Sequence, residues 1–318
     1  MIPQRITLVG APVELGAGLP GCAMGPDSLR VAGLKAALVA LGHEVEDQGN
    51  VAPICAGNAG LRGNARNAEN VIGWTRTLEE VAQHVLKNGR LPIFMGGDHA
   101  LAMGTVAGVA RHARDERRPL CVLWLDAHAD FNTPMTSESG NMHGMPVAFY
   151  CGEPGFEGVL SSDHPTVDPS NVFMVGIRSV DTRERELIAA RGVHVFDMRT
   201  VDEFGVAAIM RRILAQVERQ NAMLHVSLDV DFLDPVIAPG VGTAVNGGAN
   251  LREAHLIMEM LYESGLTTSM DLAELNPFLD DRGRSARLLV DLTASLFGRS
   301  VLDKVATATS MQGLQNVA

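Results

Sequence analysis

Residues 120–134 read LCVLWLDAHADFNTP, and this stretch decides the fold class that the sequence predicts. Its opening run is apolar throughout, which is typical of a parallel strand covered by helices on both faces. The run ends in Asp126, His128 and Asp130, one polar group at every second position. If the strand continues through them, these side chains share a face and lie close together. Carboxylates that close need a neutralising partner.

Strand-like and helix-like segments alternate along the whole chain. The alternation predicts a mostly parallel sheet with helices on both faces. No long linker or repeat interrupts it, so we expect a single three-layer α/β domain over residues 1–318. The expected strands are 6–12, 91–97, 120–128, 171–177, 193–198, 223–231 and 267–275, and the expected helices include 27–42, 76–89, 201–220 and 251–265.

Composition narrows the functional class. The chain carries 26 Lys and Arg against 37 Asp and Glu, a net charge of −11, which argues against a nucleic acid or an anionic membrane as partner. The first residues lack the basic and apolar regions of a signal peptide, and no apolar run approaches the ~20 residues that span a bilayer. Four widely spaced cysteines predict neither a disulfide framework nor a thiolate zinc site. We expect a soluble, cytoplasmic protein with a small-molecule ligand.

Polar residues also follow three other expected strands. His99 follows one of them in GGDHA, Asp229 and Asp231 end another in SLDVDF, and Glu274 ends the last in DLAEL. Ligands of open α/β sheets bind outside the carboxyl ends of the strands. These groups are therefore expected to meet the acidic cluster at 126–130.

Counting charges suggests what the cluster binds. Its four aspartates carry about −4 when ionised, and an ordinary core or capping role would leave them without enough cations nearby. Two divalent cations would cancel this charge, with two histidines as neutral imidazole ligands. Carboxylate and imidazole ligands without thiolate favour Mn²⁺ over structural zinc. The predicted metal ligands are His99, Asp126, His128, Asp130, Asp229 and Asp231.

Several motifs together resemble the ureohydrolase family, and within it the arginase branch. The resemblance runs from about residue 5 to residue 300. It implies a homo-oligomer, trimeric or hexameric, with two Mn²⁺ per subunit. It implies hydrolysis of the guanidinium group of L-arginine to L-ornithine and urea, a step of arginine metabolism and of the urea cycle. The motifs are VGAPVELGAGLPGCAMGPDSLRVAGL (9–34), GGDHA (96–100), LDAHADFNTP (125–134), SGNMHGMP (139–146) and SLDVDFLDPVIAPGVGT (227–243).

The resemblance also implies roles for single residues. Asp126 and Asp229 would bridge the two ions, and His143 would be the proton shuttle. The catalytic residues that it implies are His143, Asp130 and Glu274. The substrate-binding residues that it implies are Asn132, Ser137, Ser139, Asp181, Glu184, Thr243 and Glu274, with the first three facing the substrate carboxylate and Asp181 its α-ammonium.

Alternatives remain open at this point. A sister enzyme such as agmatinase, or another guanidino-substrate ureohydrolase, would use the same metals, and Phe232 leans toward it. Asn132 and Ser139 argue for a substrate with a carboxylate. A deacetylase-like enzyme with one zinc is less favoured, because His99 and Asp130 supply a second metal sphere. A metal-stabilised binding protein without activity would be expected to lack a ligand or the shuttle histidine.

Overall fold

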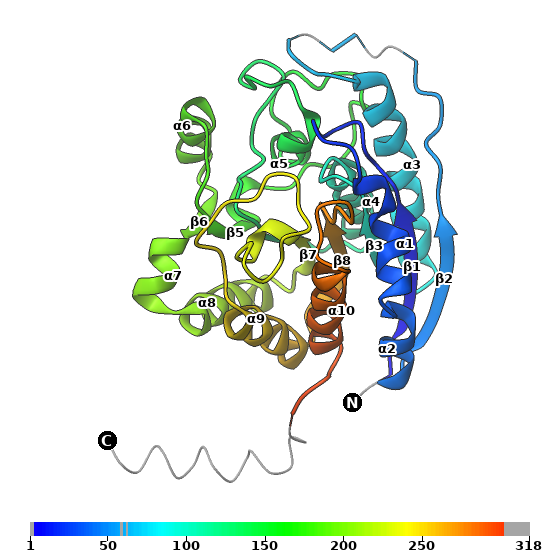
Figure 1. Cartoon of the computed structure of the whole chain (residues 1–318). Coiled ribbons are helices and arrows are strands. Elements are labelled where there is room, and N and C mark those ends of the chain that lie inside the picture. The colour runs from blue at the N-terminus through cyan, green and yellow to red at the C-terminus, as the bar shows by residue number, and fades with distance from the viewer. Residues whose placement is uncertain (1–2, 58–59, 62, 302–318) are drawn as a thin grey trace.

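The computed structural model describes residues 3–57, 60–61 and 63–301, and an eight-stranded sheet forms its centre (Figure 1). The strand order is β2-β1-β3-β8-β7-β4-β5-β6, and neighbouring strands pair in parallel. This confirms the predicted parallel α/β class. The strands are β1 (Arg5–Ala11), β2 (Glu44–Asn50), β3 (Leu91–Gly96), β4 (Leu120–Leu125), β5 (Val172–Ile177), β6 (His194–Asp197), β7 (Met223–Asp229) and β8 (Thr267–Ala273).

Helices cover both faces of the sheet, as expected. The α-helices are α1 (Gly25–Val31), α2 (Leu34–Ala40), α3 (Ala68–Lys87), α4 (Leu101–Asp115), α5 (Pro146–Tyr150), α6 (Thr182–Arg191), α7 (Met198–Phe204), α8 (Val206–Arg219), α9 (Leu251–Ser264) and α10 (Arg284–Leu296), and the short 3₁₀ helices are η1 (Cys22–Met24), η2 (Met142–Gly144), η3 (Pro169–Asn171) and η4 (Val230–Phe232).

Strand β4 shows why the sheet needs both helical layers. Its residues are buried on both faces. Leu123 and Leu125 pack into a core shared with α1, α2 and α7 to α10. Val122 and Trp124 pack into a second core with α3, α4 and α5. A continuously apolar strand is the sequence signal of this double coverage.

Two predicted helices are each broken at a glycine. The segment 27–42 forms α1 and α2, because Gly33 between them has φ 92°. The segment 201–220 forms α7 and α8, with Gly205 at φ 75°. A left-handed backbone ends a helix, and glycine adopts it without a steric cost.

Strand β2 was not predicted. Its sequence is EVEDQGN, and exposed and half-buried side chains alternate along it at the edge of the sheet. A polar edge strand carries little of the apolar signal that marks its buried neighbours, and charged side chains there oppose pairing with another chain.

The four strands that carry the predicted ligands are adjacent in the sheet. β3, β8, β7 and β4 are consecutive in the strand order, so their carboxyl ends lie side by side at one edge. This edge is where parallel α/β sheets place their ligands. No helix in the described ranges is long and apolar enough to cross a membrane.

Candidate metal centre and active site

The acidic motif does not continue the strand before it. β4 ends at Leu125, and His128 forms only an isolated bridge to Ser179. Asp130 has a left-handed backbone with φ 47°. The expectation that Asp126, His128 and Asp130 share the face of a regular strand was therefore wrong, and irregular backbone brings these side chains together.

His99 lies at the centre of the first group of ligand atoms. Its Nδ1 is 3.1 Å from Asp126 Oδ2, 3.0 Å from Asp229 Oδ2 and 3.4 Å from Asp130 Oδ2. The imidazole stacks on the Trp124 indole with ring centroids 4.0 Å apart. His99 and Asp126 are fully buried.

His128 lies at the centre of the second group. Its Nδ1 is 3.0 Å from Asp231 Oδ2 and 3.6 Å from Asp126 Oδ1. Asp126 thus presents one oxygen to each group. In the described part of the chain, ligand atoms of His99, Asp126 and Asp130 form one candidate metal site, and those of Asp126, His128 and Asp231 form another.

Three of the carboxylates are held in the same way. Asp126 Oδ1 accepts the His128 N–H, Asp229 Oδ1 accepts the Asp231 N–H, and Asp231 Oδ1 accepts the Ala127 N–H. The second oxygen of each carboxylate lies against a histidine Nδ1. In each carboxylate, one oxygen is anchored by the backbone and the other faces an imidazole nitrogen that could share a cation with it.

The tautomer of His99 and the unpaired atoms around it fit a metal ion. His99 Nε2 lies 2.8 Å from Ser227 Oγ. When Nε2 carries the ring proton and donates it to this hydroxyl oxygen, Nδ1 keeps its lone pair. His99 Nδ1 and Asp126 Oδ2 are buried without a hydrogen-bond partner although they lie 3.1 Å apart. A lone pair opposite a carboxylate oxygen is stable only with a cation or a proton between them.

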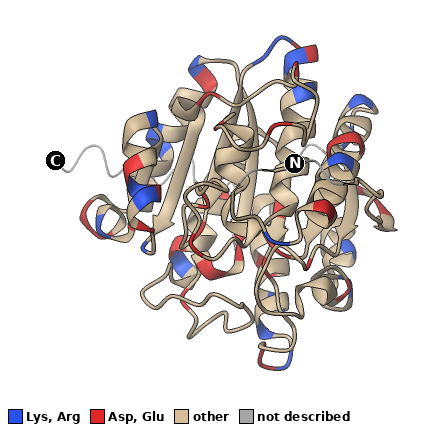
Figure 2. Ribbon diagram, turned by 90° about the horizontal axis from the view of Figure 1, so that it is seen from above, with Lys and Arg blue, Asp and Glu red and all other residues tan. Residues whose placement is uncertain are grey.

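The pKa values show that the cluster lacks positive charge. Burial, and then repulsion between neighbouring carboxylates, raises the pKa values of Asp130, Asp229 and Asp231. Burial acts to lower the pKa values of His99 and His128, but the adjacent aspartates outweigh it and raise both. Protons therefore compete with metal ions for this cluster. Seen from above, acidic residues recur around the middle of the molecule, and Lys and Arg lie mostly at its periphery (Figure 2).

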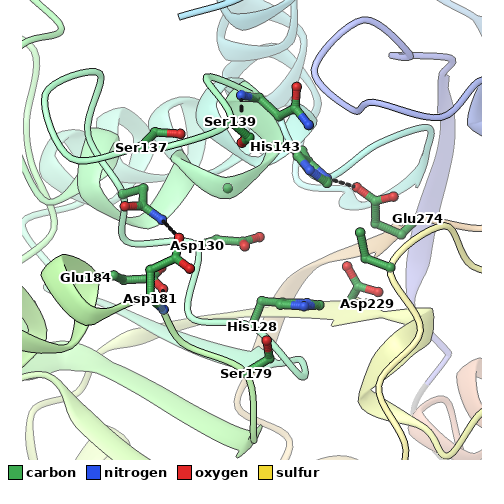
Figure 3. Close-up of a pocket in the computed structure, with 14 residues that line it drawn as sticks. His128, Asp130, Ser137, Ser139, His143, Ser179, Asp181, Glu184, Asp229 and Glu274 are labelled. Carbon is green, nitrogen blue, oxygen red and sulfur yellow. Dashed lines mark hydrogen bonds and ion pairs between the residues drawn. The ribbon is translucent and has the colours of Figure 1, made fainter. Parts of the chain in front are cut away.

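His143 and Glu274 form an ion pair beside the metal centre (Figure 3). His143 Nδ1 is 2.9 Å from Glu274 Oε1, which also accepts the His99 N–H. Burial acts to lower the pKa of His143, but attraction to Glu274 raises it to about 9. The Cys22 thiol donates to Glu274 Oε2 at 3.6 Å. Cys22 was not predicted as a site residue, although it stands within the 9–34 motif.

A polar cavity opens above these groups. Ser137 and Ser139 lie on its wall, and each hydroxyl oxygen accepts a backbone N–H, from Gly140 and Asn141 respectively. Their hydroxyl protons are therefore available to a bound molecule. The residues that line the cavity are His128, Asp130, Asn132, Ser137, Ser139, Asn141, His143, Gly144, Ser179, Asp181, Glu184, Asp229, Thr243 and Glu274.

Asn132, Asp181 and Glu184 form a linked group on the cavity wall. Asn132 Nδ2 donates to Asp181 Oδ2 at 3.1 Å. Asp181 caps α6, and Glu184 closes a reciprocal capping box by accepting the Asp181 N–H. Glu184 also accepts the Phe131 N–H. Burial raises the pKa of Glu184 to about 7.

The structure brings all the predicted site residues to one place. Asp126, Asp231 and His99 lie beneath the cavity, and Thr243 Oγ1 donates to Asp231 Oδ2 at 3.2 Å. Asn141 lines the cavity but was not predicted, although it stands within the SGNMHGMP motif. The exposed side chain of Glu138 does not line the cavity.

The fold and this site define a parallel α/β protein with a candidate metal centre at the carboxyl ends of its strands. Comparison with known proteins gives the family. The model of the arginase family matches residues 4–298, and the chain belongs to this family.

Individual proteins that are similar to this chain are also arginases. An arginase from Brucella melitensis biotype 1 is 55% identical over 93% of this chain and 97% of its own. The crystal structure of the arginase from Bacillus subtilis subsp. subtilis strain 168 has a TM-score of 0.86 at 38% identity, covering 94% of this chain and all of that one. An Entamoeba histolytica arginase, solved in complex with L-ornithine, has a TM-score of 0.84 at 29% identity over the same shares. The predicted class of enzyme, an arginase-type hydrolase, is confirmed.

Proposed function

We propose that this enzyme binds two Mn²⁺ ions per subunit and hydrolyses L-arginine to L-ornithine and urea. The observation that carries the proposal is the cation-deficient cluster of four aspartates and two histidines beneath a cavity with hydroxyl and amide groups on its wall. The ligand atoms are oxygen and nitrogen, which suits a hard or borderline divalent ion. We assign His99, Asp126, His128, Asp130, Asp229 and Asp231 to the metals.

The charge of the site favours a guanidinium group. Two dications would neutralise the four aspartates, and the Glu274 carboxylate, although paired with His143, faces the cavity beside them. A buried carboxylate at short range attracts a cationic group and repels a free carboxylate. The carboxylate of an amino acid must therefore be bound away from the metals and by neutral donors.

The opposite wall of the cavity offers such donors. The hydroxyl protons of Ser137 and Ser139 are free to donate, because both oxygens already accept from the backbone. The Asn132 side-chain amide donates one of its two protons to Asp181, and the other proton can donate to a bound molecule. We assign these three residues to the carboxylate, and the exposed Asp181 carboxylate, backed by Glu184, to the α-ammonium.

The reaction adds water to the guanidinium carbon and breaks the bond between this carbon and Nε of arginine. The two cations, when bound, supply the lowered water pKa that this attack needs. The departing nitrogen must gain a proton to leave as an amine. We assign this donation to His143, which the Glu274 carboxylate keeps protonated near neutral pH. Asp130 Oδ2 lies 3.4 Å from His99 Nδ1 and Asp130 lines the cavity, so we assign it a catalytic role as well as metal binding. Thr243 fixes Asp231 through its hydroxyl group.

The relatives support this substrate. The Brucella melitensis and Bacillus subtilis proteins are named arginases, and the Entamoeba histolytica arginase was solved with L-ornithine, the product proposed here. We also propose a homo-oligomer in the cytoplasm, and one domain over residues 1–318, of which 302–318 lie outside the described residues.

Agmatine provides the sharpest test, because it has the guanidinium group of arginine without the carboxylate. With Mn²⁺ added, we expect kcat/KM for L-arginine to exceed that for agmatine by about two to four orders of magnitude, because agmatine loses at least two hydrogen bonds to a charged group, each worth roughly 1.5–3 kcal/mol. Combining Asn132→Ala with Ser139→Ala should reduce the ratio of the two kcat/KM values, chiefly by lowering kcat/KM for arginine. A wild type that prefers agmatine would be an agmatinase. A protein that holds two ions and releases urea from neither substrate would be a binding protein.

A further inference from the structure

A second segment holds the cavity loop from outside. Residues 63–67 lie just before α3, and residues 134–140 follow the acidic motif and carry Ser137 and Ser139. About 70 positions separate the two segments in sequence, yet they lie side by side at the carboxyl edge of the sheet (Figure 1).

Asn64 makes most of the contacts between the segments. Its Nδ2 donates to the Ser137 carbonyl at 3.3 Å and to the Glu138 carbonyl at 3.0 Å. Its backbone N–H donates to the Pro134 carbonyl at 2.7 Å, and the Arg66 N–H donates to the Gly140 carbonyl at 2.8 Å. One side-chain amide therefore holds both peptide carbonyls between the two serine positions.

Glycines on both segments allow this close approach. A Cβ on Gly63 would collide with the Pro134 carbonyl, and a Cβ on Gly140 would collide with the Asn64 side chain. Both glycines also have a left-handed backbone, with φ 105° and 73°. The two segments pack tightly at both glycines, so Asn64 has one position relative to residues 134–140.

We propose that Asn64 is a positioning residue that determines specificity for substrates with an α-carboxylate. This inference rests on the proposed function, in which Ser137 and Ser139 donate to that carboxylate. Ser139 and Glu138 are exposed, so water competes with the hydrogen bonds that shape this loop. Asn64 fixes the peptide between the serines, and so keeps both hydroxyl groups directed at one carboxylate. Orienting such groups before binding lowers the entropic cost of binding.

The guanidinium end of the site is independent of this contact. His143, Glu274 and the metal ligands are held by other segments, through the Gly16 carbonyl and through the backbone around Asp126 and Asp229. Loss of the Asn64 amide should therefore weaken recognition of the carboxylate and leave the reacting centre unchanged.

The test compares Asn64→Ala with wild type on L-arginine and agmatine, in the Mn²⁺-loaded enzyme. We expect KM for arginine to rise about tenfold, as for the loss of one to two neutral hydrogen bonds. The kcat for arginine, kcat/KM for agmatine and the metal content should stay within about twofold. Asn88→Ala is the matched control, because Asn88 is also exposed at an end of α3 but contacts His84 of its own helix.

A second measurement follows the loop directly. Hydrogen exchange at the amides of 137–141 should be several times faster in Asn64→Ala and unchanged in Asn88→Ala. The inference is overturned if the ratio of kcat/KM for arginine to kcat/KM for agmatine stays within twofold of the wild-type ratio, or if kcat/KM falls equally for both substrates. The proposed function stands in either case. A wild type that prefers agmatine overturns the proposed function itself, and the carboxylate role of Asn64 with it.

Discussion

Glu274→Gln isolates the charge that keeps His143 protonated. Glutamine has nearly the shape of glutamate, and its side-chain oxygen can still accept the His99 N–H that Glu274 Oε1 accepts at 2.8 Å. The substitution removes the negative charge 2.9 Å from His143 Nδ1. Burial, which acts to lower the pKa of His143, is then opposed only by the weaker attraction of Asp130 and Asp98. We expect the pKa of His143 to fall from about 9 to its ordinary value of about 6.5 or below.

The same change makes a prediction for stability in the metal-free protein. A folded pKa of about 9 against an unfolded value of about 6.5 corresponds to roughly 3 kcal/mol. Because the folded pKa is raised, this stabilisation is fully present below pH 6.5 and is lost as the pH rises through 9. Wild type should therefore have a higher free energy of unfolding than Glu274→Gln at roughly pH 6. This difference between the two proteins should decrease by about 3 kcal/mol as the pH rises to roughly 9.5.

Two measurements on chelator-treated protein check this reasoning. NMR titration of the His143 ring gives the pKa in both proteins, and urea unfolding at the two pH values gives the difference in stability. Asp98 also responds to Glu274, which adds to burial in raising its pKa to about 6, so the His143 titration identifies the part of the stability difference that comes from this pair. A wild-type His143 that titrates near 6.5, or a difference in stability that does not change with pH, would refute the argument.

Three further substitutions test the metal centre and its surroundings. His128→Asn should lose one of the two cations and reduce activity by orders of magnitude, and metal analysis that finds two tightly bound ions in a still-active variant would contradict the two-metal assignment. Ser227→Ala removes the partner of His99 Nε2, and Mn²⁺ titration against a chelator should show affinity about 10–100-fold lower; unchanged affinity would mean that Ser227 does not orient the imidazole. His143→Ala should slow turnover by about 10²–10⁴-fold with the metal content unchanged, whereas loss of metal would make His143 a ligand.

The parts of the fold that the sequence predicts are those with a strong local signal. Buried parallel strands such as β4 and β5 are apolar throughout, so their positions were predicted closely. The polar edge strand β2 has no such signal. The break between α1 and α2 depends on the left-handed backbone of Gly33, and an isolated glycine inside an apolar pattern does not by itself predict a break.

The meeting of the candidate metal ligands was predictable because residue type and topology act together. Parallel strands bring their carboxyl ends to one edge, so Asp126 and Asp229 meet there even though β4 and β7 lie far apart in sequence. The local geometry was not predictable. Asp130 and Glu274 both have a left-handed backbone, with φ 47° and 63°, and no residue pattern specified this conformation.

The carboxylate cluster shows why these backbone details matter for the chemistry. Like charges at this separation repel, and a regular strand would offer them no compensation. Here one oxygen each of Asp126, Asp229 and Asp231 accepts a backbone N–H from the irregular segments themselves. Such bonds favour the ionised form, and the second oxygen of each carboxylate faces His99 or His128. The departure from regular strand geometry, which sequence periodicity does not reveal, is therefore what arranges this row of acidic residues as a candidate metal site.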